Sequence, residues 1–191
     1  MSDAAAPAWR VRRATAADVP GILAISNEAA VHTAANFAVE PETLASWEES
    51  FRETAALYPW LVAVDDREHV LAFAKASPWK GRCAYEYSVE ITVYVRPETH
   101  RRGIGRGLYE RLIPTLRRQG YHSAIAGIAL PNDASVRLHE AFGLVHVGTF
   151  QQVGWKFDRW HDVGYWQILL AEPGATRPHL RPVDDVFPVD Q

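Results

Sequence analysis

A strand that leads through a basic, glycine-rich loop into a helix constrains the fold of this chain more than any other feature. Apolar and polar side chains alternate over residues 85–95, which predicts a strand with one buried face and one polar face. Pro97 ends this strand. Apolar residues then recur at helical spacing from Ile104 to Leu116, and Gly120 closes the helix. A strand followed directly by such a helix indicates an α/β domain.

The loop between this strand and helix has the chemistry of an anion site. Its glycines permit close approach of a ligand, and successive backbone N–H groups at a helix N-terminus attract negative charge. The sequence therefore predicts a diphosphate site formed by Arg101, Arg102, Gly103, Ile104, Gly105 and Arg106. The alternative is an ordinary turn before a surface helix with solvated arginines, because short glycine patterns are common.

Two other nucleotide-binding loops fit this segment less well. A P-loop has four residues between its glycines, followed by lysine and then serine or threonine, and this pattern is absent here. The dinucleotide fingerprint has the spacing G-x-G-x-x-G and an acidic residue about 20 positions later, whereas the spacing here is G-x-G-x-G.

The remaining segments predict an α/β domain around one mixed sheet, ordered strand, two helices, three strands, helix, strand, helix and two strands. Further strands are expected at residues 9–14, 60–64, 70–76, 123–130, 145–154 and 164–170. Further helices are expected after Thr15, after residues 41–43 with Leu44, Trp47, Phe51 and Leu57 on the buried face, and at residues 132–144 with Asn132 as N-cap. Residues 1–172 would form one domain, and the Pro-rich residues 173–191 a loosely held tail.

Composition narrows the class of protein. Apolar residues make up 48% of the 191 residues, so a packed core is expected. The formal net charge of −3 argues against a nucleic-acid partner. One cysteine, Cys83, rules out an internal disulfide and a Cys-rich zinc site. Residues 1–7 lack the apolar segment of a secretory signal, and no stretch has the apolar length of a membrane span, so we expect a cytoplasmic protein without a membrane partner.

The strand and loop resemble the GCN5-related N-acetyltransferases, whose diphosphate loop follows the pattern Gln/Arg-x-x-Gly-x-Gly/Ala at the end of a central strand. That stretch is residues 100–105 here, and His100 replaces the usual Gln or Arg. Short motifs that are similar to the phosphinothricin acetyltransferase branch extend over about residues 9–170; they lie at residues 36–37, 58–63, 78–80, 89–95, 130–133, 135–140, 154–156 and 160–167.

This resemblance implies a mixed, splayed and twisted sheet with helices on both faces, and acetyl-CoA as co-substrate without a metal. The pantetheine arm would lie in the splay along the backbone of Val93, Tyr94 and Val95, with Asn132 nearby. Members of this branch acetylate phosphinothricin, methionine sulfoximine or methionine sulfone, and are commonly homodimers. The resemblance therefore implies a small-molecule amine substrate, direct acetyl transfer, a homodimer, and a role in antibiotic or herbicide resistance.

Acetyl transfer to an amine requires a base, a stabilised oxyanion and a proton for the leaving thiolate. Glu90, on the polar face of the central strand, is the candidate base, although a carboxylate there could also serve only as a surface ion-pair partner. A backbone N–H near Val93 would stabilise the oxyanion. In the resemblance, His139 takes the position of the tyrosine that serves many relatives as acid, and Tyr94 and Tyr109 remain competitors.

Other candidate residues carry weaker signals. A pocket for the carboxylate and side chain of an amino acid could be shaped by Asn36, Phe37, Lys80, Tyr85 and the Trp-rich C-terminal strands, although single aromatic residues more often belong to the core. Cys83 has no activating base that would make it an acetyl carrier. The adjacent pair His161 and Asp162 lacks the spaced partners of a metal site.

Three alternatives to an amino-acid acetyltransferase stay open. The first is an acetyltransferase for a polyamine, an aminoglycoside or a protein N-terminus. The second is a non-catalytic acyl-CoA sensor, which would not need Glu90. The third is an unrelated nucleotide-binding α/β protein, for which the match over residues 132–140 would be chance.

Overall fold

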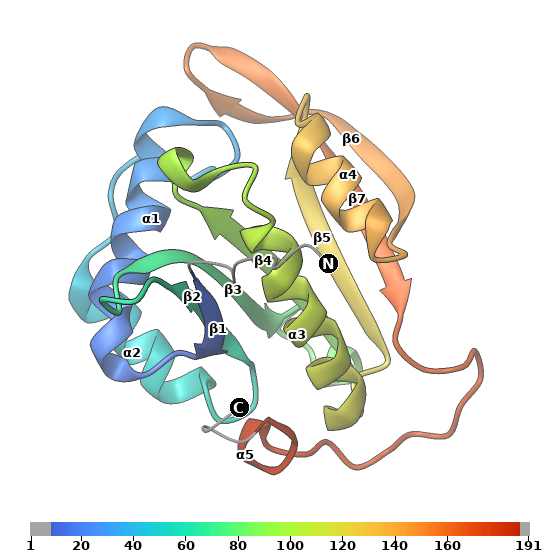
Figure 1. Ribbon diagram of the computed structural model, residues 1–191. Coiled ribbons are helices and arrows are strands. Elements are labelled where there is room, and N and C mark those ends of the chain that lie inside the picture. The colour runs from blue at the N-terminus through green and yellow to red at the C-terminus, as the bar shows by residue number, and fades with distance from the viewer. Residues whose placement is uncertain (1–8, 188–191) are drawn as a thin grey trace, which may run out of the picture.

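Seven strands form one mixed sheet in the computed structural model, which describes residues 9–187 (Figure 1). The strand order is β1-β2-β3-β4-β5-β7-β6, and only β4 and β5 run parallel. The strands are β1 (Arg10–Arg13), β2 (Trp60–Val64), β3 (Val70–Pro78), β4 (Ser88–Val95), β5 (Ser123–Ala129), β6 (Val145–Lys156) and β7 (Arg159–Leu169). The predicted mixed sheet is confirmed; the prediction about a signal segment concerns residues outside the described part.

Helices cover both faces of this sheet, as expected. One face packs against α1 and α2, and the other packs mainly against α3 (Figure 1). The helices are α1 (Val19–His32), α2 (Leu44–Thr54), α3 (Ile104–Gln119), α4 (Asp133–Ala141) and α5 (Val183–Val186), with 3-10 turns at Ala16–Asp18, Cys83–Tyr85 and Pro97–Thr99. Asn132 caps α4, because its side-chain oxygen accepts a hydrogen bond from the Ser135 N–H at 3.2 Å.

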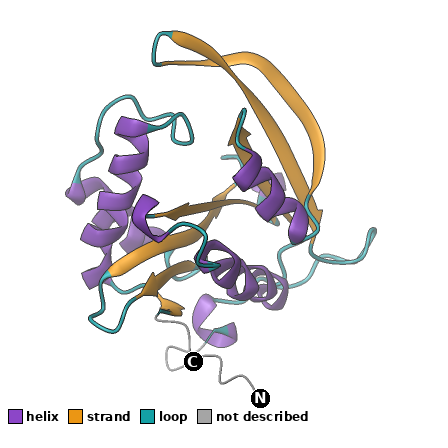
Figure 2. Ribbon diagram, turned by 45° about the horizontal axis from the view of Figure 1, so that its top comes forward, coloured by secondary structure: helices purple, strands orange, loops and turns teal. Residues whose placement is uncertain are grey.

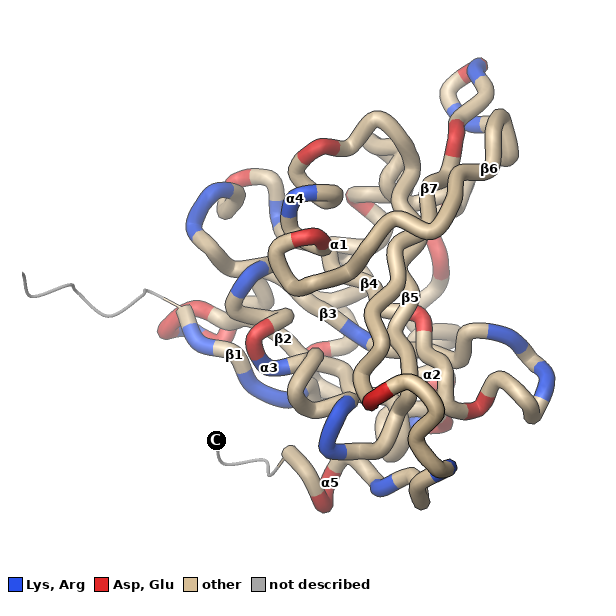
Figure 3. Tube along the Cα trace, turned by 90° about the vertical axis from the view of Figure 1, so that its right-hand side faces the viewer, with Lys and Arg blue, Asp and Glu red and all other residues tan. Residues whose placement is uncertain are grey.

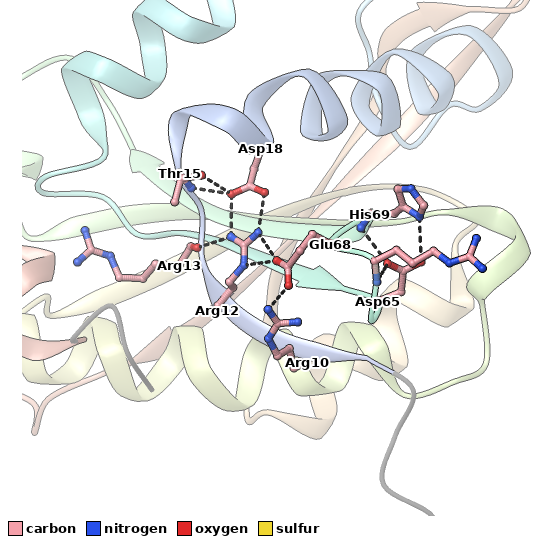
Figure 4. Close-up of polar contacts among 9 residues, drawn as sticks. Arg10, Arg12, Arg13, Thr15, Asp18, Asp65, Glu68 and His69 are labelled. Atoms are coloured by element: carbon pink, nitrogen blue, oxygen red, sulfur yellow. Dashed lines mark hydrogen bonds and ion pairs between the residues drawn. The ribbon is translucent and has the colours of Figure 1, made fainter.

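An ion-pair network fixes the start of α1 against the first strand (Figure 4). The Arg12 guanidinium donates to both carboxylate oxygens of Asp18, at 2.8 and 2.9 Å, and the same carboxylate accepts from the Thr15 N–H. Burial opposes the ionised form of Asp18, but the hydrogen bonds from Arg12 and Thr15 lower the pKa of this carboxyl below its ordinary value. Glu68, in the β2–β3 turn, completes the network by accepting from Arg12.

Strand β4 has the predicted two faces, although it begins at Ser88 and not at residue 85. Val89 and Ile91 are buried in the core under α3. Glu90 and Tyr94 lie on the opposite face, where Tyr94 packs against the second hydrophobic cluster below α1 and α2. The side chain of Glu90 thus belongs to the α1–α2 side of the sheet.

The two late strands are longer than predicted and form one continuous hairpin (Figure 2). The predicted break over residues 155–163 is wrong: β6 extends to Lys156 and β7 begins at Arg159. Phe157 and Asp158 make the turn with φ values of 52° and 55°. Such turns usually contain glycine, so this pair gave no hairpin signal in the sequence.

Two predictions of burial are wrong. Leu57 lies beyond the end of α2, and its side chain is 45% exposed, like the 39% exposed Leu44. The C-terminal segment is not loose over its whole length, because Val183 and Phe187 are buried in the main core. The Val183 N–H also donates to the Ala56 carbonyl at 2.9 Å.

The sheet opens between β4 and β5, and this opening positions the site. The two parallel strands pair only at Ser88, Val89 and Glu90 of β4. Beyond Glu90, residues 91–95 pair with β3 alone and residues 126–129 pair with β7 alone. One edge of β4 is therefore unpaired from residue 91 onward, as the implied splay requires.

Candidate active site

The loop before α3 is an array of free backbone donors. Arg101 and Gly103 have positive φ values of 63° and 75°, which turn the chain into the helix. Within the described residues, the N–H groups of Ile104, Gly105 and Arg106 have no backbone acceptor, and the first helical hydrogen bond joins the Gly107 N–H to the Gly103 carbonyl at 2.9 Å. These amides lie at the positive end of a 16-residue helix, which is the arrangement that the predicted anion site requires.

Side chains around this loop hold its backbone and add charge. His100, which replaces the usual Gln or Arg, donates from Nε2 to the carbonyl of Val95 at 3.0 Å. Gly105 lies against Val93 and Val95, where an added Cβ would be 3.6 Å from the nearest Val95 methyl. Arg101 and Arg102 are exposed, as is Arg106, which pairs with Glu110 at 3.0 Å. The loop is thereby fixed to the end of β4, next to the opening.

Glu90 lies at the vertex where β4 and β5 part. It makes the last pair with β5, opposite Ile125. A Cβ added to Gly127 on β5 would be 3.6 Å from Oε1 of Glu90, so the carboxylate lies over a residue without a side chain. Among residues 9–187, no hydrogen bond or ion pair engages this carboxylate. Partial burial raises the pKa of Glu90, and the positive charges of Lys80 and Lys75 partly offset this effect.

A cavity of about 270 Å³ lies on the α1–α2 side of the sheet, the side to which Glu90 belongs, although Glu90 itself is not among its lining residues. Thr92 and Tyr94, the next residues on the face of Glu90, form part of its wall. Hydroxyl, amide, aromatic and charged side chains converge there, as in a site for a small polar molecule. The lining residues are Ser26, Asn36, Glu42, Ser46, Trp47, Ser50, Phe73, Lys75, Thr92 and Tyr94.

Most of these lining residues could not be recognised from the sequence as part of a site. Glu42, Ser46 and Ser50 come from α2 and the segment before it, and nothing in their spacing indicates a cavity. Lys75 did carry a signal, because it is the single charged residue of the nine in β3. A lysine within an otherwise apolar strand requires either an exposed face or a polar cavity.

The four predicted substrate residues do not all meet at this cavity. Asn36 lines it and donates to the Ser26 carbonyl at 3.2 Å. Phe37 instead packs on the β6–β7 hairpin, with its ring centroid 5.9 Å from that of His161. Lys80 is exposed and lies over the Trp79 ring, and Tyr85 is 45% exposed in a 3-10 turn; neither lines the cavity.

The candidate acid His139 is 3% exposed and fully engaged in hydrogen bonds. Its Nδ1–H donates to the Ser135 carbonyl at 2.8 Å, so Nε2 accepts from the Tyr109 hydroxyl at 2.9 Å. Burial lowers the pKa of His139, and burial also raises the pKa of Tyr109 above its ordinary value. The pair is a neutral, buried hydrogen-bond unit between α3 and α4, while Tyr94 donates its hydroxyl proton to the Ala35 carbonyl at 2.9 Å.

Lys156 joins the hairpin to the loop that carries Asn36 and Phe37. Its ammonium donates to the carbonyls of Ala30, Asn36 at 2.6 Å and Ala38 at 2.8 Å. The Ala30 carbonyl belongs to the last turn of α1, where a cation is favoured. Desolvation lowers the pKa of Lys156. This lysine therefore fixes the shape of the loop on one side of the cavity.

Replacing Lys156 with methionine is expected to loosen that loop. The variant keeps the apolar stem but leaves buried carbonyls without donors, at a cost of roughly 1–3 kcal/mol each. We expect a lower melting temperature and a KM for the amine about 10-fold higher, with the KM for acetyl-CoA changed less than about twofold. Arg159→Met, at the exposed hairpin tip, is the matched control. Equal KM values for both substrates in Lys156→Met and wild type would contradict this role.

The other sequence signals give no second site. Cys83 is a free, exposed thiol. No group of three or more His, Cys, Asp or Glu side chains arranged for a metal occurs within residues 9–187. In the same part of the chain, no helix has both the length and the apolar character needed to cross a membrane.

Comparisons with known proteins show what this chain is similar to. The profile of the acetyltransferase (GNAT) family matches residues 24–144. A phosphinothricin N-acetyltransferase of Streptomyces viridochromogenes is 44% identical over 92% of this chain and 95% of its own. A methionine sulfoximine/methionine sulfone acetyltransferase of Pseudomonas paraeruginosa is 38% identical over 88% and 98%. A phosphinothricin acetyltransferase of Sinorhizobium meliloti, solved with acetyl-CoA, superposes with a TM-score of 0.84 at 32% identity, covering 96% of this chain and 97% of its own.

Proposed function

The chain belongs to the acetyltransferase (GNAT) family and is an acetyl-CoA-dependent N-acetyltransferase, and we propose that its acceptor is a small amino acid of the phosphinothricin, methionine sulfoximine or methionine sulfone type. The observation that carries this proposal is the position of Glu90. Glu90 makes the last pair before the opening between β4 and β5, on the same face of β4 as Thr92 and Tyr94, which line the cavity below α1 and α2. A proton acceptor is thereby available where an electrophile from one side would meet an amine from the other.

The residues of the opening fit acetyl-CoA. The free amides of Ile104, Gly105 and Arg106 would hold its diphosphate, with Arg101 and Arg102 adding positive charge. The unpaired edge of β4 at Val93, Tyr94 and Val95 would hydrogen-bond the pantetheine arm as an added strand does, with Asn132 close by at the start of α4. When bound there, acetyl-CoA supplies a thioester carbonyl as the electrophile.

Glu90 would act as the general base. An ammonium group cannot attack a carbonyl, so its proton has to leave first. The Glu90 carboxylate has no other partner among the described residues, and its raised pKa brings it closer to that of an amine. A backbone N–H of β4 near Val93 would stabilise the oxyanion that forms on the carbonyl.

The proton for the departing thiolate has three candidate sources. His139 lies on α4 beside the opening, but its Nδ1–H is donated to Ser135. The Tyr109 hydroxyl donates to His139 in turn, so protonation through this pair would require both groups to shift. Tyr94 lies on the cavity side, and burial raises its pKa to about 12. We propose the His139–Tyr109 pair as the donor, because it is the candidate on the α3–α4 side of the sheet.

The cavity argues against a polyamine as acceptor. Lys75 is part of its wall, and Glu42 is the single acidic residue in the lining. A polycation would bring further positive charge against Lys75. A non-catalytic sensor would have no use for a carboxylate at the vertex.

A thiol-release assay with acetyl-CoA and a panel of amines tests this proposal. The panel contains phosphinothricin, methionine sulfone, spermidine and free amino acids, and mass spectrometry identifies each acetylated product. We expect turnover with at least one of the two amino-acid analogues and kcat/KM at least about 100-fold lower with spermidine. A preference for spermidine, or product from none of the amino acids, would overturn the assignment.

We also propose that the chain works in the cytoplasm and gives resistance to antibiotic or herbicide amino acids of this type. We further propose that it forms a homodimer through the β6–β7 hairpin. The hairpin forms the edge of the sheet and carries few charged residues (Figure 3). An exposed apolar surface of this extent favours protein association. Its exposed apolar residues are Val145, Val147, Phe150, Val153, Trp155, Phe157, Trp160 and Leu169.

A further inference from the structure

Lys75 is a half-buried lysine at the cavity whose charge the protein does not pair. Its Nζ lies 4.3 Å from the ring centroid of Trp60 and 4.7 Å from that of Trp47. No hydrogen bond or ion pair of this ammonium occurs within the part of the chain that the structure describes. Two indole faces attract a cation, but they accept no proper N–H hydrogen bond. The three N–H donors of Lys75 are thus left to whatever enters the cavity.

The ammonium opens into the cavity and is not sealed off. Lys75 belongs to the lining, and Nζ is not among the fully buried side-chain atoms without a hydrogen-bond partner. Desolvation lowers the pKa of Lys75, while the carboxylates of Glu42 and Glu90 act in the opposite direction from beyond ion-pair distance. A ligand with a negatively charged oxygen would therefore relieve an existing electrostatic cost.

The direction of the side chain shows on which side of the cavity the ammonium lies. Lys75 lies opposite Thr92 of β4 on one side and opposite Trp60 of β2 on the other. Its ammonium contacts Trp60 and the α2 residue Trp47, so it is turned toward β2 and away from the strand that carries Glu90. An acceptor whose amine lies at Glu90 would therefore reach Lys75 with a group that extends across this face of the sheet toward β2.

We propose that Lys75 is a specificity residue that binds an anionic group at the far end of the acceptor side chain, so that the enzyme prefers acidic amino acids, such as those ending in a phosphinate or carboxylate. This inference rests on the proposed function and narrows its substrate class. The ammonium donates to the anionic oxygens at the inner end of the cavity, while the amine at the other end faces Glu90. Trp47 and Trp60 hold the lysine in place.

Two acceptors of matched shape isolate this interaction. Phosphinothricin and methionine sulfone have side chains of the same length that end in a tetrahedral atom with two oxygens and a methyl group, but only the phosphinate is charged. Both carry the same α-carboxylate. The ratio of their kcat/KM values therefore reports the side-chain charge alone, and it cancels effects on the α-carboxylate or on Glu90.

The test compares Lys75→Met and Lys75→Arg with the wild-type enzyme at one fixed pH, because loss of the Lys75 charge also changes the pKa of Glu90 and the ratio of the two acceptors cancels that change. We expect Lys75→Met to lower kcat/KM for phosphinothricin about 30- to 100-fold, mostly through KM, and to change that for methionine sulfone less than about threefold. Lys75→Arg should keep most of the preference. Calorimetry of phosphinothricin binding to the protein saturated with coenzyme A should show the same loss of affinity. The melting temperature should not fall, because methionine fits between two indoles without a buried charge.

Lys80→Met serves as the matched control for charge. Lys80 also lowers the pKa of Glu90 but does not line the cavity, so its loss should change both acceptors equally. An equal fall for both acceptors in Lys75→Met, or no change in either, would overturn the role of Lys75. Turnover by the wild-type enzyme with either acceptor would still support the proposed function, whereas a wild type that acetylates neither would refute that function itself.

Discussion

Replacing Glu90 with glutamine is expected to lower kcat about 100-fold or more while the affinity for acetyl-CoA changes less than about twofold. Glutamine keeps the shape of the side chain at the vertex between β4 and β5, but it cannot accept the proton of the ammonium group. Stopped-flow or steady-state thiol release gives kcat, and calorimetry gives the cofactor affinity. Glu98→Gln, at an exposed site in the turn after β4, is the matched control.

The pH profile gives this prediction a second readout. Because burial raises the pKa of Glu90, the carboxylate is protonated and inactive as base already above the usual pKa of a glutamic acid. Wild-type kcat/KM should therefore fall as the pH drops through that raised value. The residual activity of Glu90→Gln should lack this acidic limb. A Glu90→Gln enzyme with wild-type kcat would show that the base lies elsewhere.

Replacing Arg106 with proline is expected to weaken acetyl-CoA binding about 10- to 100-fold more than replacing it with alanine. Both variants lose the guanidinium, but proline also removes the Arg106 N–H, which has no acceptor within the described residues. One hydrogen bond from a backbone N–H to a charged oxygen contributes about 1.5–3 kcal/mol, which corresponds to this range. The position is in the first turn of α3, where proline removes no helical hydrogen bond.

Comparing the two variants separates the contribution of the Arg106 N–H to cofactor affinity from the contribution of the guanidinium charge. Calorimetry with coenzyme A measures both dissociation constants, and thermal melting without ligand checks that the helix is intact. The alanine variant alone should lose a few-fold in affinity, and this loss should shrink as salt is added, because an exposed guanidinium is screened. Equal dissociation constants for the alanine and proline variants would show that the amides of the loop do not bind the diphosphate.

The central part of the fold and site could be predicted because its signals are local. The alternation in β4, the proline after it and the glycines at the start of α3 each reflect a backbone requirement over a few residues. Position on the polar face made Glu90 a candidate base, and the family resemblance favoured this role over that of a surface ion-pair partner. The order of the motifs along the chain indicated the family, and the comparisons confirm that family.

The cavity could not be predicted, because it forms between elements distant in sequence. Glu42, Ser46 and Ser50 meet Lys75 and Thr92 only when α2 packs on the sheet. The packing of the C-terminal segment against the core could not be predicted for a related reason. Val183 and Phe187 are isolated apolar residues among prolines and charges, and without a period they give no sign of the core position that they occupy.

A crystal structure with coenzyme A and phosphinothricin bound together would show whether both substrates meet at Glu90. We expect the diphosphate on the amides of residues 104–106, the pantetheine arm along the open edge of β4, and the amine of the acceptor within hydrogen-bond reach of Glu90, at about 3 Å or through one water. Cofactor density away from the loop before α3, or an amine with no path to the Glu90 carboxylate, would contradict this arrangement.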